Sequence, residues 1–387
     1  MSRFSQRLPP HADTNAISAA IAAVAADGAF VDLTESNPTR VGFDYPSGLL
    51  AGLGGQAGLA YEPSPLGLPE ARAAVAADAG RRGVHVDPAH VVLSASSSES
   101  YAWLFKLLCD PGDAVLVPRP SYPLFEHLTS LEAVRAIPYD LEYHRRWQID
   151  FASIAAAPVH TRAVLVVSPN NPTGSYLDLV ELERLVAICR ERDWALIADE
   201  VFADYPLDAT SPVTDVAARA GVLSFSLGGA SKALGLPQIK LGWMVAGGPP
   251  AQRDAALAAL ELIADTYLSV STPVQKAAPG LLRDGAAVRA QIQSRIAHNL
   301  ARARTLAGAH PACELLRVEG GWSAVVRVPA IRSEEELVLD LLRRERILVH
   351  PGFFFDFRHE AFIVVSLLPA PDMFEDALGR VLRFSVT

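Results

Sequence analysis

Segments with strand character alternate with segments of helical periodicity through the middle of this chain, and this alternation constrains the fold more than any other feature of the sequence. Strands that are apolar throughout are typical of parallel sheets covered by helices on both faces. The strand-like runs are 90–93, 114–117, 133–138, 163–167, 195–198, 223–226 and 241–246. We therefore predict an α/β fold whose large domain contains a mostly parallel seven-stranded sheet.

The rest of the pattern predicts a second, smaller domain. Ile17, Ile21 and Val24 recur at helical spacing near the N-terminus, and a long helical pattern runs from 286 to 307. Shorter alternating elements follow it to the C-terminus. The predicted organisation is an N-terminal segment 1–45, a large domain 46–280 and a C-terminal domain 281–387. We expect the first and last of these to form one smaller α+β domain.

Composition and charge exclude several classes of function. The 387 residues are half hydrophobic and one fifth charged, so the chain can bury a large core. The net charge of −9 comes from interspersed acidic and basic residues, and no basic stripe is present for a nucleic-acid backbone. No apolar run approaches the roughly 20 residues that span a bilayer. We expect neither nucleic-acid binding nor membrane insertion.

Cysteine and histidine usage favours a reducing compartment and argues against a metal site. The three cysteines have neither C-x-x-C spacing nor the density of a disulfide framework, which predicts a cytoplasmic location. The ten histidines include no H-E-x-x-H or comparable ligand cluster. Isolated histidines such as His350 are therefore expected to be structural or surface groups, and no metal is predicted.

Three polar motifs each follow an apolar strand-like run, at the place where ligands collect in open α/β sheets. The motifs are SPNNPTG at 168–174, Asp199-Glu200 and Ser231-Lys232. Taken singly they have ordinary interpretations, namely a turn, a strand end and a solvated lysine in a glycine-rich loop. A carboxylate at the end of a buried strand is costly without a cationic partner, and a protonated ring nitrogen would be such a partner.

In this order and at these separations, the three motifs resemble the class I and II aminotransferases, pyridoxal-5′-phosphate (PLP) enzymes of the aspartate aminotransferase fold. Further stretches match in the same order: Tyr61, Gly67-Leu68-Pro69 with Arg72, 94–99, Pro111-Gly112-Asp113 and Pro120-Ser121-Tyr122-Pro123. The resemblance covers nearly the whole chain. It implies a PLP cofactor and transfer of an amino group between an amino acid and a 2-oxo acid.

The resemblance also assigns roles around the cofactor ring. Lys232 matches the lysine that forms the Schiff base with PLP and then shuttles the proton, and Ser231 precedes it in the cofactor site. Asp199 matches the carboxylate that keeps the pyridinium nitrogen protonated. Asn171 matches the amide that hydrogen-bonds the phenolate oxygen. Tyr122 matches the aromatic residue stacked on the ring. Lys232 and Asp199 are thus the implied catalytic pair.

A phosphate site is implied by a second group of residues. Ser97 and Ser98 begin a helical pattern, and a helix N-terminus offers free N–H groups to a phosphate, although serines there also serve as simple N-caps. Lys240 occupies the position of a phosphate-binding arginine, which it replaces without the bidentate fork. Tyr61 matches a residue that reaches the phosphate of the neighbouring subunit, so the resemblance implies a homodimer.

Three departures from the family pattern concern the substrate end of the site. Val364 occupies the position of the arginine that grips the substrate α-carboxylate, so we expect a displaced cation such as Arg358 or Arg327 to replace it. Phe202 stands where a tyrosine donates to the phenolate oxygen. Tyr267 falls near the position of an arginine in dicarboxylate-specific members, which makes aspartate a doubtful donor.

Two other functions remain open at this point. A PLP-dependent β-eliminating lyase uses the same fold and the same lysine, and it would release ammonia and pyruvate from cysteine-like substrates. A non-catalytic PLP-binding regulator would carry an added DNA-binding domain, but here the aminotransferase-like region starts almost at residue one, and we expect no helix-turn-helix unit. Amino transfer is the interpretation we favour.

Overall fold

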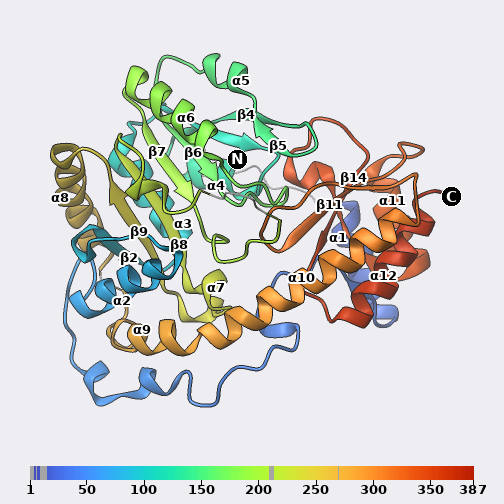
Figure 1. Cartoon of the computed structure of the whole chain (residues 1–387), viewed down its shortest axis with the longest axis horizontal. Helices are drawn as coiled ribbons and strands as arrows, with labels where there is room; N and C mark the ends of the chain where they lie inside the picture. The colour runs from blue at the N-terminus through green and yellow to red at the C-terminus, as the bar shows by residue number, and fades with distance from the viewer. Residues whose placement is uncertain (1–3, 6, 9–14, 209–212, 269) are drawn as a thin grey trace.

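The structure, a computed structural model, describes residues 4–5, 7–8, 15–208, 213–268 and 270–387 (Figure 1). Its large sheet has eight strands in the order β2-β9-β8-β7-β6-β3-β4-β5. Their bounds are β2 Val91–Ser94, β3 Ala114–Arg119, β4 Arg135–Tyr143, β5 Trp147–Ile149, β6 Thr161–Val167, β7 Ala195–Asp199, β8 Ser224–Gly229 and β9 Gly242–Gly247. The central strands run parallel, β9 is antiparallel to β8 and β2, and β5 is antiparallel to β4.

The predicted α/β class is confirmed, but the predicted strand number of seven is wrong because β5 adds an eighth. This strand returns on β4 through a tight hairpin in which Arg145 has φ 66° and His144 N–H donates to the Arg146 carbonyl at 2.9 Å. Buried Trp147 then packs against Tyr143. A three-residue strand is too short to give a periodic signal in the sequence.

Helices cover both faces of the sheet, because successive residues of each strand point to opposite faces. Ala163 and Leu165 of β6 pack with Trp103 on one side, while Val164 and Val166 pack with Leu185 on the other. The first face carries α3 Ser97–Leu108, α4 Leu124–Leu131 and α8 Pro250–Tyr267, and the second carries α5 Phe151–Ala155 and α6 Leu179–Arg192. The strands therefore read as nearly continuous apolar runs.

A second, antiparallel sheet has the strand order β10-β11-β14-β13. Its strands are β10 Glu314–Leu315, β11 Ser323–Arg327, β13 His350–Pro351 and β14 Phe362–Ser366. Beside it, β1 Val31–Asp32 pairs in parallel with β12 Ile347–Leu348. This pairing joins the N-terminal segment to the C-terminal region. The nearby helices are α1 Ala16–Asp27, α11 Glu334–Asp340 and α12 Pro371–Phe384.

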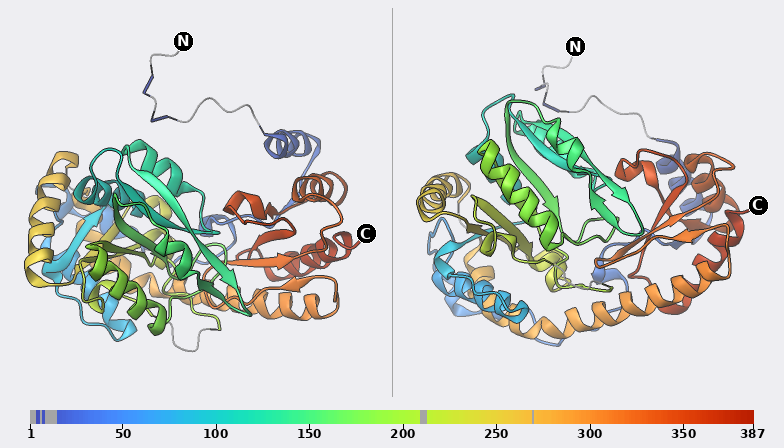
Figure 2. Two further views of the ribbon diagram at one scale, coloured as in Figure 1. Left: turned by 90° about the horizontal axis from the view of Figure 1, so that it is seen from above. Right: turned by 45° about the horizontal axis from the view of Figure 1, so that its top comes forward.

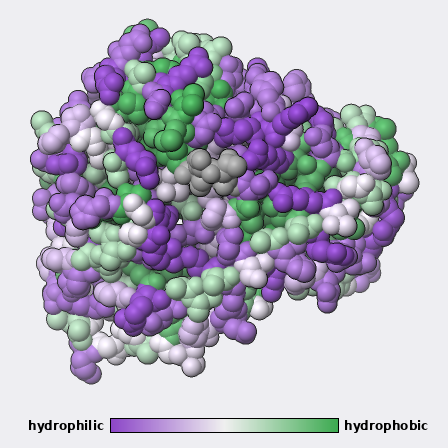
Figure 3. Space-filling view, in the orientation of Figure 1, coloured by the Kyte–Doolittle hydropathy of each residue, from purple (hydrophilic) through white to green (hydrophobic). Residues whose placement is uncertain are grey.

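The long helix α10, Ala286–Gly308, extends from the side of the large sheet to the side of the small one, as Figure 2 shows. The remaining helices are α2 Pro69–Ala79, α7 Ala230–Ala233 and α9 Thr272–Asp284. On the face drawn in Figure 3, hydrophobic atoms form separate patches among hydrophilic ones. Within the described residues, none of the helices combines the length and the apolar character that crossing a membrane would require.

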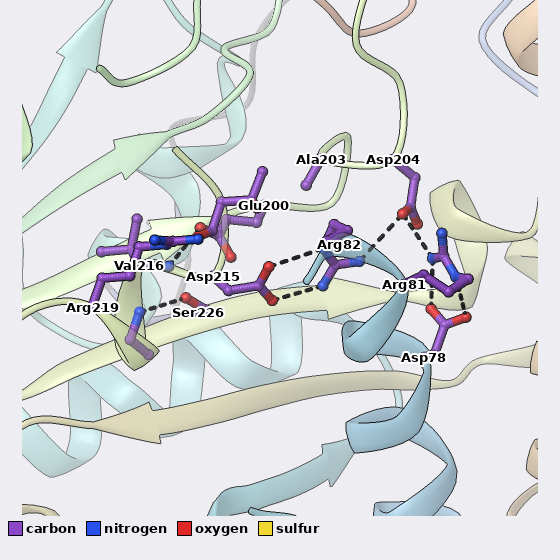
Figure 4. A network of polar contacts seen from close by, with 12 residues as sticks. Asp78, Arg81, Arg82, Glu200, Ala203, Asp204, Asp215, Val216, Arg219 and Ser226 are labelled. Carbon is purple, nitrogen blue, oxygen red and sulfur yellow. Dashed lines mark hydrogen bonds and ion pairs between the residues drawn. The ribbon is translucent and has the colours of Figure 1, made fainter. Parts of the chain in front are cut away.

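A buried ion network anchors the segment that follows β7 (Figure 4). Arg82 donates to both carboxylate oxygens of Asp215, at 2.7 and 2.9 Å, and to Asp204 at 3.2 Å. Arg81 bridges Asp204 and Asp78 at 2.8 Å each. The network thus ties the turn after α2 to Asp204 and Asp215, which lie between β7 and β8.

Candidate active site

A cavity of about 280 Å³ lies at the carboxyl ends of the parallel strands and extends to the small sheet. Most of the residues predicted to bind the cofactor ring and phosphate line it: Ser97, Ser98, Tyr122, Asn171, Asp199 and Lys232. They come from five separate places along the large sheet. Ser97 and Ser98 follow β2, Tyr122 follows β3, Asn171 follows β6, Asp199 ends β7 and Lys232 follows β8. These residues come together because the five strands are neighbours or near neighbours in the sheet.

Lys232 lies on the short helix α7, directly after β8. Close packing requires the glycines there, because a Cβ on Gly228 would meet the Trp243 indole at 2.3 Å. The Lys232 Nζ lies 5.0 Å from the Trp322 ring centroid and 5.5 Å from that of Phe202. Burial lowers the pKa of Lys232, while the charge of Asp199 acts in the opposite direction. The amine is therefore easier to deprotonate than an exposed lysine.

Asp199 ends β7 as a buried carboxylate facing the cavity. Burial raises its pKa, although the Tyr101 hydroxyl donates to Oδ2 at 2.7 Å and the Val201 N–H donates to Oδ1 at 3.1 Å. Lys232 supplies the only positive charge that acts on it strongly among the described residues. The site thus has room for a cation beside Asp199, which would remove the cost of burying its charge.

The 168–174 turn holds Asn171 at the wall of the cavity. The neighbouring Asn170 fixes the turn, because its amide donates to the Pro120 carbonyl and to Thr173 Oγ1, and its oxygen accepts from Ser121 Oγ. Asn171 itself accepts a hydrogen bond from Ser323 Oγ at 3.2 Å. That contact joins the large sheet to β11 of the small sheet.

The N-terminus of α3 forms another part of the wall. Ser96 is the N-cap, with its hydroxyl accepting from the Glu99 N–H at 3.2 Å, so Ser97 and Ser98 are the first helical residues. Gly242 packs directly on this turn, because a Cβ on it would lie 2.8 Å from the Ser96 carbonyl carbon. Lys240 precedes that contact by two residues and is exposed, with φ 54°.

Three of the predicted cofactor residues lie outside the cavity lining. Ser231 is half-buried beside Lys232, and Lys240 is at the surface near the start of β9. Tyr61 lies on the segment between residues 59 and 69 and is 69% exposed. These placements leave their roles as predictions.

The substrate end of the cavity differs from what the sequence predicted. Val364 lines it, but Arg358 pairs with Asp140 at 2.9 Å and Arg327 pairs with Glu314, so neither arginine replaces the missing guanidinium. His350, which the sequence predicted to be a structural or surface group, lines the cavity. β13 pairs with β14 in a register that places His350 opposite Val364, and this pairing brings His350 to the cavity wall.

Phe202 and Tyr267, the other two residues that depart from the family pattern, lie on different surfaces. Phe202 lines the cavity and contacts Trp322 edge to face, at a centroid distance of 5.3 Å. Tyr267 ends α8 outside the cavity lining, where its ring packs near Trp103 and Lys106. Phe202 therefore contributes an apolar wall, and Tyr267 belongs to a different surface.

Several polar residues of the cavity were not predicted: Tyr101, Ser323, Thr34, Ser36 and Ser366. Tyr101 had a usable signal, because it lies four residues after Ser97 and so shares its face of the helix. The others lie on β11, on β14 or just after β1, and their approach depends on pairings between distant segments.

Comparison with known proteins agrees with this geometry. Residues 54–380 match the family profile of aminotransferases class I and II. The glutamate-pyruvate aminotransferase AlaA of Escherichia coli strain K12 is 27% identical over 362 residues, covering 91% of this chain and 89% of AlaA. A crystal structure of an Escherichia coli aminotransferase superposes with TM-score 0.85 at 26% identity, over 96% of this chain and 95% of the other.

The fold itself also matches a Thermus thermophilus aspartate aminotransferase double mutant, with TM-score 0.85 and 21% identity over 99% and 100% of the two chains. The predicted family, fold and cofactor class are thereby confirmed. The chain belongs to the class I and II aminotransferases, transaminases of the aspartate aminotransferase fold that use PLP.

Proposed function

We propose that the cavity transfers an amino group from an amino acid to a 2-oxo acid, with Lys232 as the group that moves the proton. The observation that supports this most directly is the pairing of a half-buried lysine, whose pKa is lowered, with a buried carboxylate, whose pKa is raised, in one cavity. A base with a lowered pKa and an acid with a raised pKa, close together beyond the ends of parallel strands, are typical of acid–base sites.

The residues that line the cavity have the chemical groups that would bind PLP. Asp199 is a buried anion without a full cationic partner, which suits a protonated ring nitrogen. The α3 N-terminus, with Ser97 and Ser98, suits a phosphate dianion, and Lys240 near β9 would add a positive charge. When bound, PLP supplies an electron sink for the charge left as the substrate α-proton departs.

The residues of this chain then have distinct tasks. Lys232 Nζ takes the proton from the substrate Cα and returns it, because its lowered pKa leaves it free to accept one. Asp199 would keep the ring nitrogen protonated, and Tyr101 holds the Asp199 carboxylate in position. Asn171 would hold the ring oxygen with its amide, and Tyr122 would help to hold the ring.

We also propose a homodimer in which Tyr61 reaches the phosphate site of the second copy. Tyr61 is 69% exposed and Leu59 is 79% exposed, so both side chains are accessible to a second copy. Analytical ultracentrifugation tests the dimer, and Tyr61→Phe should weaken PLP binding without changing the sedimentation coefficient. The three free cysteines are consistent with a cytoplasmic location.

The test of the proposed function is the absorption spectrum of the PLP-loaded protein, wild type beside Lys232→Ala, during addition of single L-amino acids. Lys106→Ala is the matched control, because Lys106 pairs with Glu132 away from the cavity lining. Donors should change the spectrum of wild type and of the control only. The corresponding 2-oxo acids should appear, and the original spectrum should return when a second 2-oxo acid is added.

Two outcomes would contradict the proposal. A spectrum that is the same in wild type and Lys232→Ala would remove Lys232 from the site. Release of ammonia and pyruvate from cysteine-like donors, without any acceptor, would identify a β-eliminating lyase instead.

A further inference from the structure

The substrate end of the cavity has an unusual set of charges. Among the described residues that line it, Lys232 and His350 are the only basic side chains, and no arginine is present. Arg358 and Arg327 are held by Asp140 and Glu314 outside the lining. A substrate carboxylate that enters this end needs a cationic or hydrogen-bonding partner, because burying it alone is costly.

His350 stands beside the position where that partner is expected. β13 and β14 pair with His350 directly opposite Val364, and residues directly opposite in an antiparallel pair project from the same face with Cβ atoms about 4.5–5.5 Å apart. Ser366, two residues beyond Val364 on the same strand, shares this face. All three residues line the cavity.

The imidazole is free to bind a ligand. Within the described part of the chain, no residue hydrogen-bonds either ring nitrogen of His350. The ring contacts Phe354 and Phe355, at centroid distances of 5.7 and 5.6 Å. Buried polar groups normally have a partner, so an imidazole that lines a cavity without one is suited to receive a ligand.

Other donors surround the same end of the cavity. The Ser36 hydroxyl lines it from the segment after β1, and Thr34 lines it too, with its own hydroxyl donating to Asp32 Oδ1. Trp322 also lines it, and its indole N–H is buried without a hydrogen-bond partner among the described residues. These neutral donors complement a single cation and do not replace it.

We propose that His350 binds the carboxylate of the amino acid and 2-oxo acid substrates, and that it takes up a proton from solvent as the carboxylate enters. The inference rests on the proposed amino transfer, for which it names the carboxylate anchor. Leu124, Phe125 and Leu128 line the cavity as well, so the substrate class is one with an apolar side chain. His350 carries a positive charge only when it is protonated, whereas an arginine in this place would be charged permanently.

The electrostatic surroundings support this coupling. Burial lowers the pKa of His350, which favours the neutral ring, and Asp32 on β1 acts in the opposite direction. Glu334 of α11 is occupied by the Phe353 and Phe362 N–H groups at 2.8 Å. Lys232 and Asp199 are the charged groups of the large sheet that line the same cavity. An entering carboxylate would therefore be the group that makes protonation of His350 favourable.

Proton-linked binding has a measurable consequence. Above the pKa of the free imidazole, the affinity for a carboxylate should fall about tenfold for each pH unit, because one proton is taken up with each ligand. Calorimetric titration of the PLP-loaded protein with isovalerate, a carboxylate that has no amino or oxo group, measures this without catalysis. Repeating it in buffers of different ionisation enthalpy counts the protons taken up.

Wild type, His350→Gln and His298→Gln are compared between pH 7 and pH 9. His298 is an exposed residue on α10 and serves as the matched control. We expect wild type and His298→Gln to take up one more proton than His350→Gln, and His350→Gln to bind isovalerate at least tenfold more weakly at pH 7. Lys232 is present in all three proteins, so a difference in proton uptake between wild type and His350→Gln is due to His350.

A second variant keeps the test decisive if His350→Gln disturbs the site. His350→Gln combined with Val364→Arg should restore isovalerate binding without the extra proton. Equal proton uptake by wild type and His350→Gln, equal affinities, or no binding to wild type would each overturn the inference. If proton-linked binding is found but no amino acid changes the cofactor spectrum, the proposed function fails while His350 remains a carboxylate site.

Discussion

The ion network around Arg82 should carry a large share of the stability of the chain near Asp199. In Arg82→Met the variant keeps the apolar stem of the side chain but loses two hydrogen bonds to Asp215 and one to Asp204. The Asp204 and Asp215 side chains are only 5% and 6% exposed. Asp204 retains Arg81, but Asp215 loses both charged hydrogen bonds from Arg82.

The expected cost is about 3–5 kcal/mol in the free energy of unfolding, because removal of one partner leaves a buried charge uncompensated. Arg302→Met is the matched control. Arg302 pairs with Glu375 at the surface, where both side chains are about 40% exposed, and such pairs contribute about 0–1 kcal/mol. The two arginine variants should therefore differ by at least about 2 kcal/mol.

The cost should also depend on pH. Burial, together with the charge of Asp215, raises the pKa of Glu200 to about 8, and Arg82 opposes that rise. A carboxyl whose pKa is raised on folding stabilises the native state fully below its unfolded pKa and loses that contribution as pH rises through the folded value. Removing Arg82 raises the pKa of Glu200 further, so the penalty should be larger at pH 8.5 than at pH 6.

Urea unfolding of the PLP-loaded proteins, followed by circular dichroism at both pH values, measures these differences. The difference between the two pH values should be about 1 kcal/mol or more, since each proton is equivalent to about 1.4 kcal/mol per pH unit. A loss below about 1 kcal/mol in Arg82→Met, or a loss equal to that of Arg302→Met, would refute the idea that this buried network anchors the segment.

Three further predictions concern the cofactor site. Asp199→Asn should retain PLP on Lys232 but lower kcat by about 100-fold or more, because an amide cannot hold the ring nitrogen protonated; single-turnover kinetics measures this, and an unchanged kcat would exclude the role. Ser97→Ala should weaken PLP binding about tenfold in equilibrium dialysis and leave pyridoxal, which has no phosphate, unaffected. Gly242→Ala should weaken PLP binding similarly, because its Cβ would lie 2.8 Å from the Ser96 carbonyl carbon and displace the start of α3; normal affinity in this variant would show that the turn adapts.

Much of the fold could be predicted from the sequence because the responsible signals are local. Continuous apolar runs predicted β6 and β7 to within two residues, and helical spacing predicted α10 as the long helix it is. The placement of Lys232, Asp199 and Asn171 in one cavity also followed from local order, since each residue comes after a strand and the parallel strands end at the same edge.

The substrate end could not be predicted in the same way. The family pattern correctly drew attention to Val364, but the expected replacements, Arg358 and Arg327, form ion pairs elsewhere. Nothing in the sequence around His350 marks it as a cavity residue. Its place follows from the pairing of β13 with β14 and from the packing of the small sheet against the large one.

The sequence by itself therefore determined the longer elements, the parallel core and the grouping of Lys232, Asp199 and Asn171. These depend on periodicity and on turns whose residues are neighbours in the chain. Only the tertiary structure decided which side chains meet across sheets, including Tyr101 with Asp199 and His350 with Val364. The physical reason is that such contacts depend on the register between distant strands and on the packing of one sheet against the other, which a local pattern does not encode.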